Sequence, residues 1–253
     1  MSARFSNKVA IVTGAGNGIG EAIATRLASE GASVLVADIE EESARKVVTA
    51  IIASGGEAIA CRTDVSQRSN VEEMVAQAVG AWGRLDIQIS NAGITDREPF
   101  LEMTDALWQR VLSTNLQGAF LCGQVAARQM VAQGDGGRIV NTASNSGVFG
   151  GRGRAAYGAS KAGIINLTQT MAIELAEHKI LVNAVSPGAT RTRATSGDMP
   201  RGSVMNRMPL QRFGEPREIA AVAAFLASDE CSFTTGHTYC SDGGFTVAGV
   251  MEG

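Results

Sequence analysis

Short runs of β-branched residues alternate along the chain with longer segments whose apolar residues recur every three or four positions. Lys8–Thr13, which reads KVAIVT, is typical of a fully buried strand because its apolar run is short and rich in valine and isoleucine. The same pattern predicts six further strands, at Ser33–Asp38, Glu57–Cys61, Leu85–Ser90, Arg138–Ser144, Ile180–Ser186 and near His237–Ser241.

Helical periodicity occupies the segments between these strands. It predicts helices at Gly18–Glu30, Glu40–Ser54, Ser69–Ala81, within Thr104–Gln133, at Ala155–His178 and within Glu215–Ser228. Alternating strands and helices imply right-handed crossovers and a parallel sheet with helices on both faces. Seven strands fit one doubly wound α/β domain over residues 1–253. Gly188–Gly214 lacks a clear pattern, and we expect this segment, called the lid below, to cover a substrate.

Composition narrows the class of protein. Hydrophobic residues make up 45% and charged residues 19%, so a sizeable core can form. The net charge of −3 argues against nucleic-acid binding through a broad basic surface. No apolar run approaches the roughly 20 residues that span a bilayer, so no membrane partner is expected. The polar Met1–Lys8 segment does not resemble a signal peptide, which favours a cytoplasmic location.

Cysteine and histidine offer little chemistry. The four cysteines, Cys61, Cys122, Cys231 and Cys240, show no metal or redox spacing, and we expect buried free thiols. His178 and His237 are the only histidines and lie far apart in the sequence. We therefore expect no metal site and no Ser-His-Asp triad, so any catalysis must rest on other residues.

A glycine-rich turn follows the first predicted strand. Thr13–Gly20 reads TGAGNGIG and leads into a helix. Glycines let a pyrophosphate approach the backbone, and the helix N-terminus offers free N–H groups with a partial positive charge. The spacing G-x-x-x-G-x-G differs from the usual dinucleotide fingerprint, so a plain tight turn remains an alternative. The candidate cofactor-binding residues here are Gly14, Asn17, Gly18, Ile19 and Gly20.

Asp38 ends the second predicted strand, 18 residues after Gly20. A carboxylate there accepts hydrogen bonds from adenosine ribose hydroxyls and repels a 2′-phosphate. Neither Ile39 nor Asn17 offers a positive charge to such a phosphate. The sequence therefore favours NAD over NADP as the cofactor. Asp38 could also cap the following helix.

Tyr157 and Lys161 lie four residues apart at the start of a predicted helix, so they share one helix face. An ammonium beside a phenol favours the phenolate, which makes the tyrosine a usable proton donor and acceptor. Ser144 ends the preceding predicted strand, and strand carboxyl ends face the cofactor in such sheets. A Y-x-x-x-K pair occurs by chance in many helices, so its weight here comes from its position.

From Lys8 to about Phe245 the chain resembles the short-chain dehydrogenase/reductase family, whose members have a Rossmann-type fold. The resemblance rests on the glycine turn and on motifs spread along the chain: Asp64-Val65, Asn91-Ala92-Gly93, Asn115, Ser144, Tyr157-x-x-x-Lys161, Pro187-Gly188 and Asp242-Gly243-Gly244. One departure from the family pattern is Ala143, where relatives often have a serine, which leaves Ser144 as the only candidate.

The resemblance implies a role for each matching residue. Tyr157 would be the general acid/base, Ser144 would polarise the substrate oxygen, and Lys161 would hold the nicotinamide ribose and favour the phenolate. Asn115 would hold a water in a proton relay. The cofactor would be lined by Asp64 and Val65 at the adenine, by Asn91, Ala92 and Gly93 near its ribose, by Pro187 and Gly188, and by Thr190 and Thr192 at the carboxamide.

Together these observations predict an NAD-dependent oxidoreductase that interconverts a secondary alcohol and a ketone. An alternative within the family is a 3-oxoacyl-carrier-protein reductase, although such enzymes generally use NADPH. A different class is a non-catalytic nucleotide-binding scaffold, which would be expected to lack one of Ser144, Tyr157 and Lys161. Apolar positions occur on several faces of the helices at Thr104–Gln133 and Ala155–His178; they are Phe120, Leu121, Ile164, Ile165, Leu167 and Met171. With the family resemblance they predict a homotetramer, with a dimer as the alternative.

The lid is rich in arginine although the whole chain is acidic. Asp198 is its only acid, and its arginines are Arg191, Arg193, Arg201, Arg207 and Arg212. With Arg152 and Arg154 just before Tyr157, these side chains could pair with a carboxylate or phosphate on an anionic substrate. The alternative is that they are solvated, or bind the cofactor pyrophosphate or a neighbouring subunit.

Overall fold

The computed structural model describes residues 3–192 and 202–249, and it contains one seven-stranded parallel sheet. The strand order is β3-β2-β1-β4-β5-β6-β7, so the chain reverses direction across the sheet between β1 and β4. This confirms the predicted doubly wound α/β fold. The strands are β1 Val9–Thr13, β2 Ser33–Asp38, β3 Glu57–Arg62, β4 Ile87–Ser90, β5 Gly137–Thr142, β6 Ile180–Pro187 and β7 Thr238–Ser241.

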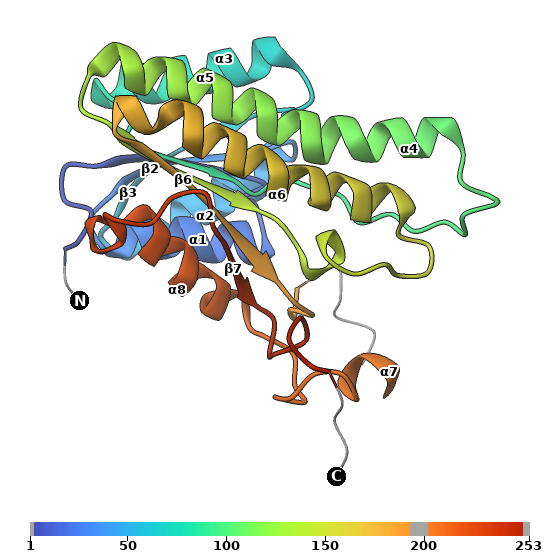
Figure 1. Cartoon of the computed structure of the whole chain (residues 1–253). Coiled ribbons are helices and arrows are strands. Elements are labelled where there is room, and N and C mark those ends of the chain that lie inside the picture. Colours follow the sequence, from blue (N-terminus) through green and yellow to red (C-terminus); the bar gives the residue numbers. More distant parts are fainter. Residues whose placement is uncertain (1–2, 193–201, 250–253) are drawn as a thin grey trace.

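Helices cover both faces of the sheet, as Figure 1 shows. One face packs against α1 (Gly18–Ser29), α2 (Glu41–Ala53) and α8 (Pro216–Ala227). The other is covered by α3 (Arg68–Trp82), α5 (Gly118–Gln133) and α6 (Ala155–Leu175), while α4 (Asp105–Leu112) extends beyond the sheet and packs against α6. The central strands β1 and β4 are buried on both sides, which explains the almost uninterrupted apolar sequence of β1, whereas β4 carries the buried polar side chains of Gln88 and Ser90.

Two predicted segments differ in the structure. The helical region at Thr104–Gln133 is divided into α4 and α5 by a π-helical turn at Ser113–Gln117. Strand β5 ends at Thr142, not at Ser144. Ser144 instead begins a 3₁₀ turn at Asn145–Gly147, and its hydroxyl accepts a hydrogen bond from the Ser146 N–H at 3.1 Å. The polar Ser144 side chain thus starts a turn in place of continuing the strand.

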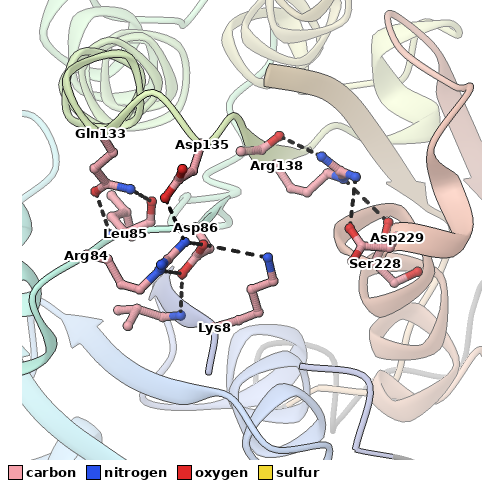
Figure 2. A network of polar contacts seen from close by, with 11 residues as sticks. Lys8, Arg84, Leu85, Asp86, Gln133, Asp135, Arg138, Ser228 and Asp229 are labelled. Atoms are coloured by element: carbon pink, nitrogen blue, oxygen red, sulfur yellow. Dashed lines mark hydrogen bonds and ion pairs between the residues drawn. The ribbon is translucent and has the colours of Figure 1, made fainter. Parts of the chain in front are cut away.

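An ionic network joins the amino ends of the strands, shown in Figure 2. Asp86 accepts hydrogen bonds from the Val9 N–H at 2.9 Å and from both Nε and Nη2 of Arg84, while Lys8 lies 3.8 Å away. Nearby, Arg138 pairs with Asp229 at 3.1 Å. These contacts connect β1, β4, β5 and the turn after α8 at the edge opposite the predicted site.

Cysteine burial agrees with the sequence analysis at three of four positions. Cys61, Cys122 and Cys231 are buried free thiols, but Cys240 is exposed. The expectation was wrong for Cys240 because β7 is the edge strand and buries its side chains only in part. Among the described helices, none is long and apolar enough to cross a membrane.

Candidate active site

The glycine turn is packed so closely that larger residues would not fit. A Cβ at Gly20 would lie 2.1 Å from the Gly14 carbonyl oxygen, and one at Gly14, whose φ is +61°, would lie 2.7 Å from Ala92 Cα. Asn17 precedes α1 but its side chain does not cap the helix, so the first-turn N–H groups need another partner. An anion such as a pyrophosphate fits this arrangement.

Asp38 lies at the carboxyl end of β2, beside the glycine turn. Its carboxylate is buried and accepts hydrogen bonds from the backbone N–H groups of Gly16, at 2.8 Å, and Glu40, at 3.0 Å. These bonds fix a negative charge against the turn. The carboxylate contacts both flanking backbone segments, so the structure brings together the two parts of the predicted adenosine site.

Thr13 and Asn91 connect the carboxyl ends of β1 and β4. The Thr13 hydroxyl accepts from the N–H groups of Asn91 and Ala92, at 3.0 and 3.2 Å. The Asn91 amide donates to the carbonyls of Thr13 and Gly14 and accepts from Thr142. Thr13 and Thr142 are structural contributors that were not predicted as site residues; only their places at the ends of the two strands that flank β4 could have indicated them.

Lys161 is fully buried at the centre of the site. Its ammonium donates to the Thr142 carbonyl at 2.7 Å and lies 5.7 Å from the Tyr157 ring centroid. Burial lowers the pKa of Lys161 from 10.5 to about 8. The four-residue spacing therefore places the ammonium and the phenol ring of Tyr157 on one helix face, as predicted.

The turn after Ser144 is pressed against α6. A Cβ at Gly147 would lie 2.8 Å from the carbonyl carbon of Lys161, and one at Gly158 would lie 3.1 Å from the Ser146 carbonyl oxygen. The buried Ser144 is therefore carried by a turn whose backbone touches the helix of Tyr157 and Lys161. Close packing, more than any side-chain bond, joins these three residues.

Asn115 lies within the π-helical turn, a type of distortion found frequently at functional sites. Its side-chain oxygen accepts from the Ile94 N–H at 2.9 Å, and its amide donates to the Ile94 carbonyl and to Ser160. The buried side chain thus holds the segment after β4 against α6. A Cβ at Gly93 would lie 3.2 Å from the Asn115 oxygen, so a larger residue there would press on this side chain.

The remaining predicted residues also lie along the carboxyl ends of the strands. Asp64 bonds to Ser66, and Val65 is buried against Gly118. Gly188, after Pro187, packs against Asp242, where a Cβ would lie 2.6 Å from its Cα. Thr190 pairs with Gly214 in an isolated bridge. Thr192 lies beside Gly18 at the start of α1, with its Cγ2 3.4 Å from the position of a Cβ there.

The lid arginines differ in their surroundings. Arg191 and Arg212 pair with Glu215 and Glu218. The guanidinium of Arg207 lies close to the rings of Phe149 and Phe245. Arg193, Arg201 and Asp198 lie outside the described residues. The lid is also more structured than predicted, because a short helix, α7, occupies Gly202–Met205. Within the described ranges, no group of three or more His, Cys, Asp or Glu could hold a metal ion.

Comparison with known proteins identifies the family of this chain. Residues 14–246 match a family profile described as enoyl-(acyl carrier protein) reductase. The chain is 39% identical over 246 residues to 3-oxoacyl-[acyl-carrier-protein] reductase of Thermotoga maritima, covering 96% of this chain and all of that protein. It is 40% identical over 251 residues to cis-4-hydroxycyclohexanecarboxylate dehydrogenase of Sinomonas cyclohexanicum, covering 98% of this chain and all of the relative.

A solved structure agrees equally well. The 7α-hydroxysteroid dehydrogenase complexed with NADH and 7-oxo glycochenodeoxycholic acid superposes with a TM-score of 0.91 at 35% identity, covering 96% of each chain. These relatives act on hydroxyl or keto groups, and their match runs over nearly the whole length. The protein is therefore an oxidoreductase that belongs to the short-chain dehydrogenase/reductase family.

Proposed function

We propose that this protein is an NAD-dependent dehydrogenase that interconverts a small secondary alcohol and its ketone, with Tyr157 as general acid/base. The observation that carries the proposal is the buried Lys161 ammonium, held by Thr142 one helical turn from Tyr157 and backed by the turn of Ser144. The proposal is supported because a phenol, an ammonium and a hydroxyl lie near the carboxyl ends of the strands of one parallel sheet.

Each side chain has a defined task in this proposal. Tyr157 gives its proton to the ketone oxygen during reduction and takes it from the alcohol during oxidation. Ser144 donates a hydrogen bond to that oxygen. Lys161 stabilises the negative charge on Tyr157 when the proton has left. Asn115 keeps the segment after β4 in position beside Lys161.

The cofactor fits the residues at the strand ends. The uncapped start of α1 receives the pyrophosphate, Asp38 the adenosine ribose, and Thr192 lies where the lid meets the turn. The remaining proposed contacts are Asp64, Val65, Asn91, Gly93, Pro187, Gly188 and Thr190. When bound, the nicotinamide supplies or accepts the hydride. Asp38 favours NAD because its fixed charge repels a 2′-phosphate.

A 3-oxoacyl-carrier-protein reductase is the second candidate, because several relatives carry that name. The dehydrogenases of cyclic alcohols among the relatives favour a small free substrate instead. The two candidates differ in cofactor and in substrate size. An activity assay distinguishes the two candidate functions. It compares a carrier-protein-bound 3-oxoacyl chain with 4-hydroxycyclohexanecarboxylate and cyclohexanol, each tested with NAD(H) and with NADP(H).

Replacing Tyr157 by phenylalanine tests the catalytic assignment. Loss of the hydroxyl removes the proton donor, so we expect kcat to fall by at least about 10²-fold. The binding of NADH, followed by its fluorescence, should change little, because the ring and Lys161 remain. Near-normal turnover by the Tyr157→Phe variant would refute the mechanism.

We also propose that the chain forms one domain and assembles as a homotetramer. A hollow on α4 and α5, which includes the π-helical turn between them, supports the assembly. Its apolar lining is Leu112, Leu116, Phe120, Leu121 and Leu167, and its polar lining is Arg68, Gln109, Ser113 and Gln117. Phe120 is exposed in the single chain, as large apolar side chains at subunit contacts are before assembly. Two residues of the predicted apolar set, Leu121 and Ile164, are buried in the core and need no partner.

A further inference from the structure

Arg154 lies against the catalytic tyrosine. It precedes α6, and its guanidinium carbon is 5.1 Å from the centroid of the Tyr157 ring. Its side-chain stem fills the space over Gly151, where a Cβ would lie 3.3 Å from Arg154 Cδ. The ring of Tyr157 therefore has two cations near it, the ammonium of Lys161 and the guanidinium of Arg154.

No described carboxylate compensates the Arg154 charge. Burial is the main cause that lowers the pKa of Arg154 below its usual value, and the positive charge of Arg97 lowers it further, whereas Tyr157 raises it. Arg97 is brought close by the hydrogen bond from the Glu98 N–H to the Gly153 carbonyl, at 3.1 Å. A half-buried guanidinium that is further disfavoured by a second positive charge is costly unless an anion compensates it.

The lid arginines are less suited to bind an anion. Arg191 and Arg212 already face glutamates. The guanidinium carbon of Arg207 lies 4.1 Å from the ring centroid of Phe149 and 4.9 Å from that of Phe245, so it holds the lid against two neighbouring segments. Exposed Arg152 makes no ion pair with a described residue. Of the described arginines near the site, Arg154 combines burial, free charge and proximity to Tyr157.

We propose that Arg154, with Arg97 beside it, binds a carboxylate of the substrate and so selects hydroxy and oxo acids over their neutral analogues. This inference rests on the proposed oxidoreductase function and names its substrate class. A guanidinium binds a carboxylate through two parallel N–H···O bonds, which also orients the substrate. The carboxylate stays at the rim while the carbinol group reaches Tyr157, so acid and reacting oxygen are recognised by adjacent side chains.

The test compares one acid with its neutral ester. Wild type, Arg154→Gln and the matched control Arg152→Gln are assayed with cis-4-hydroxycyclohexanecarboxylate, its methyl ester and cyclohexanol, using NAD. We expect Arg154→Gln to lower kcat/KM for the acid at least about tenfold, the scale of a lost charge-assisted hydrogen bond. Its kcat/KM for the ester should stay within about threefold, and Arg152→Gln should change neither ratio more than twofold.

A binding measurement keeps the inference independent of turnover. Calorimetry measures the affinity of each NAD-loaded variant for cyclohexanecarboxylate and for cyclohexanecarboxamide. Both compounds lack the reacting hydroxyl. Wild type should bind the carboxylate in preference, and Arg154→Gln should lose that preference while Arg154→Lys keeps part of it.

The possible failures are distinguishable. Equal loss for acid and ester in Arg154→Gln would show that Arg154 supports Tyr157 and does not bind substrate, which overturns the inference. Equal wild-type rates and affinities for acid and neutral analogues would overturn it too. If cyclohexanol is turned over and the acid is not, the inference about substrate acids fails, while the oxidoreductase proposal stands. No turnover of any alcohol, despite selective binding of the carboxylate, would contradict the proposed reaction and keep the anion site.

Discussion

At the scale of single residues, Asp38 is the clearest determinant of cofactor choice. Both of its carboxylate oxygens accept backbone N–H bonds, so its charge cannot swing away from an incoming 2′-phosphate. The sequence already predicted this position, because an acid at the end of the second strand needs only the chain order to be placed. The backbone partners that hold it, at Gly16 and Glu40, could not be read from the sequence.

Replacing Asp38 by serine should narrow the preference for NAD. We expect wild type to show the higher kcat/KM with NAD, and Asp38→Ser to reduce the NAD/NADP ratio by at least about tenfold, since a short-range charge repulsion disappears. The control is Glu40→Gln, which removes an exposed charge two residues away. A wild type that prefers NADP would show that the Asp38 argument is wrong.

Lys161 makes stability depend on pH. Its pKa is about 8 in the folded protein and near 10.5 in the unfolded chain, because burial disfavours the charged form. The unfolded chain therefore binds more protons between about pH 8 and 10.5, and the contribution of Lys161 to stability rises with pH in that window. The full change corresponds to about 3 kcal/mol.

The Lys161→Met variant isolates this effect, since methionine does not titrate. Urea unfolding of wild type and variant at pH 7, 8.5 and 10, without cofactor, should show the free energy of unfolding of wild type increasing relative to that of the variant. A difference between the two proteins that stays constant from pH 7 to 10 would contradict the lowered pKa.

At the scale of elements, the 3₁₀ turn at Asn145–Gly147 connects β5 to the catalytic helix. Gly147 does not need a left-handed conformation, so alanine there meets only the backbone of Lys161 and Ala162. Gly150, three residues later, has open space around its Cβ position. Alanine variants at Gly147 and Gly150 therefore distinguish the effect of close packing from the effect of reduced backbone flexibility.

Gly147→Ala should therefore displace Ser144 from α6. We expect a loss of about 1–3 kcal/mol in the free energy of unfolding, typical of overpacking, and at least a tenfold lower kcat/KM. Gly150→Ala should change stability by no more than about 0.5 kcal/mol and leave kcat/KM unaltered. Equal behaviour of the two variants in urea unfolding and steady-state assays would show that the turn is not packed as described.

Helices and strands were predicted well where the apolar residues followed a single helical or strand-like pattern along the sequence. The strands and the helices around them emerged because buried parallel strands are continuous apolar runs. The π-helical turn was missed because one extra residue shifts the apolar phase without changing composition. The turn after Thr142 was missed for another reason: Ala143 and Ser144 are compatible with a strand, and the turn that Ser144 begins is fixed by packing against Gly158 and Lys161 that the sequence does not show.

At the scale of the whole molecule, the hollow on α4 and α5 makes assembly testable. Light scattering at micromolar concentration should give the mass of a tetramer. Phe120→Glu should lower that mass, because a charge would be buried at the contact. Ile52→Glu, which changes an exposed apolar residue on α2, is the matched control and should not. A monomeric wild type would refute the assembly.

The ionic network around Asp86 lies at the amino ends of the strands, while the proposed catalytic groups lie at their carboxyl ends. Mutations at the amino ends of the strands and mutations at their carboxyl ends can therefore accumulate independently during evolution. Substitutions at Arg97 and Arg154 could change the range of alcohols that the enzyme accepts without weakening the ionic contacts that hold β1, β4 and β5 together. Directed evolution could use the same separation. Thermal stability would first be raised by substitutions at Arg84, Asp135 or Asp229, and variants at Arg97 and Arg154 would then be screened for altered substrate selectivity.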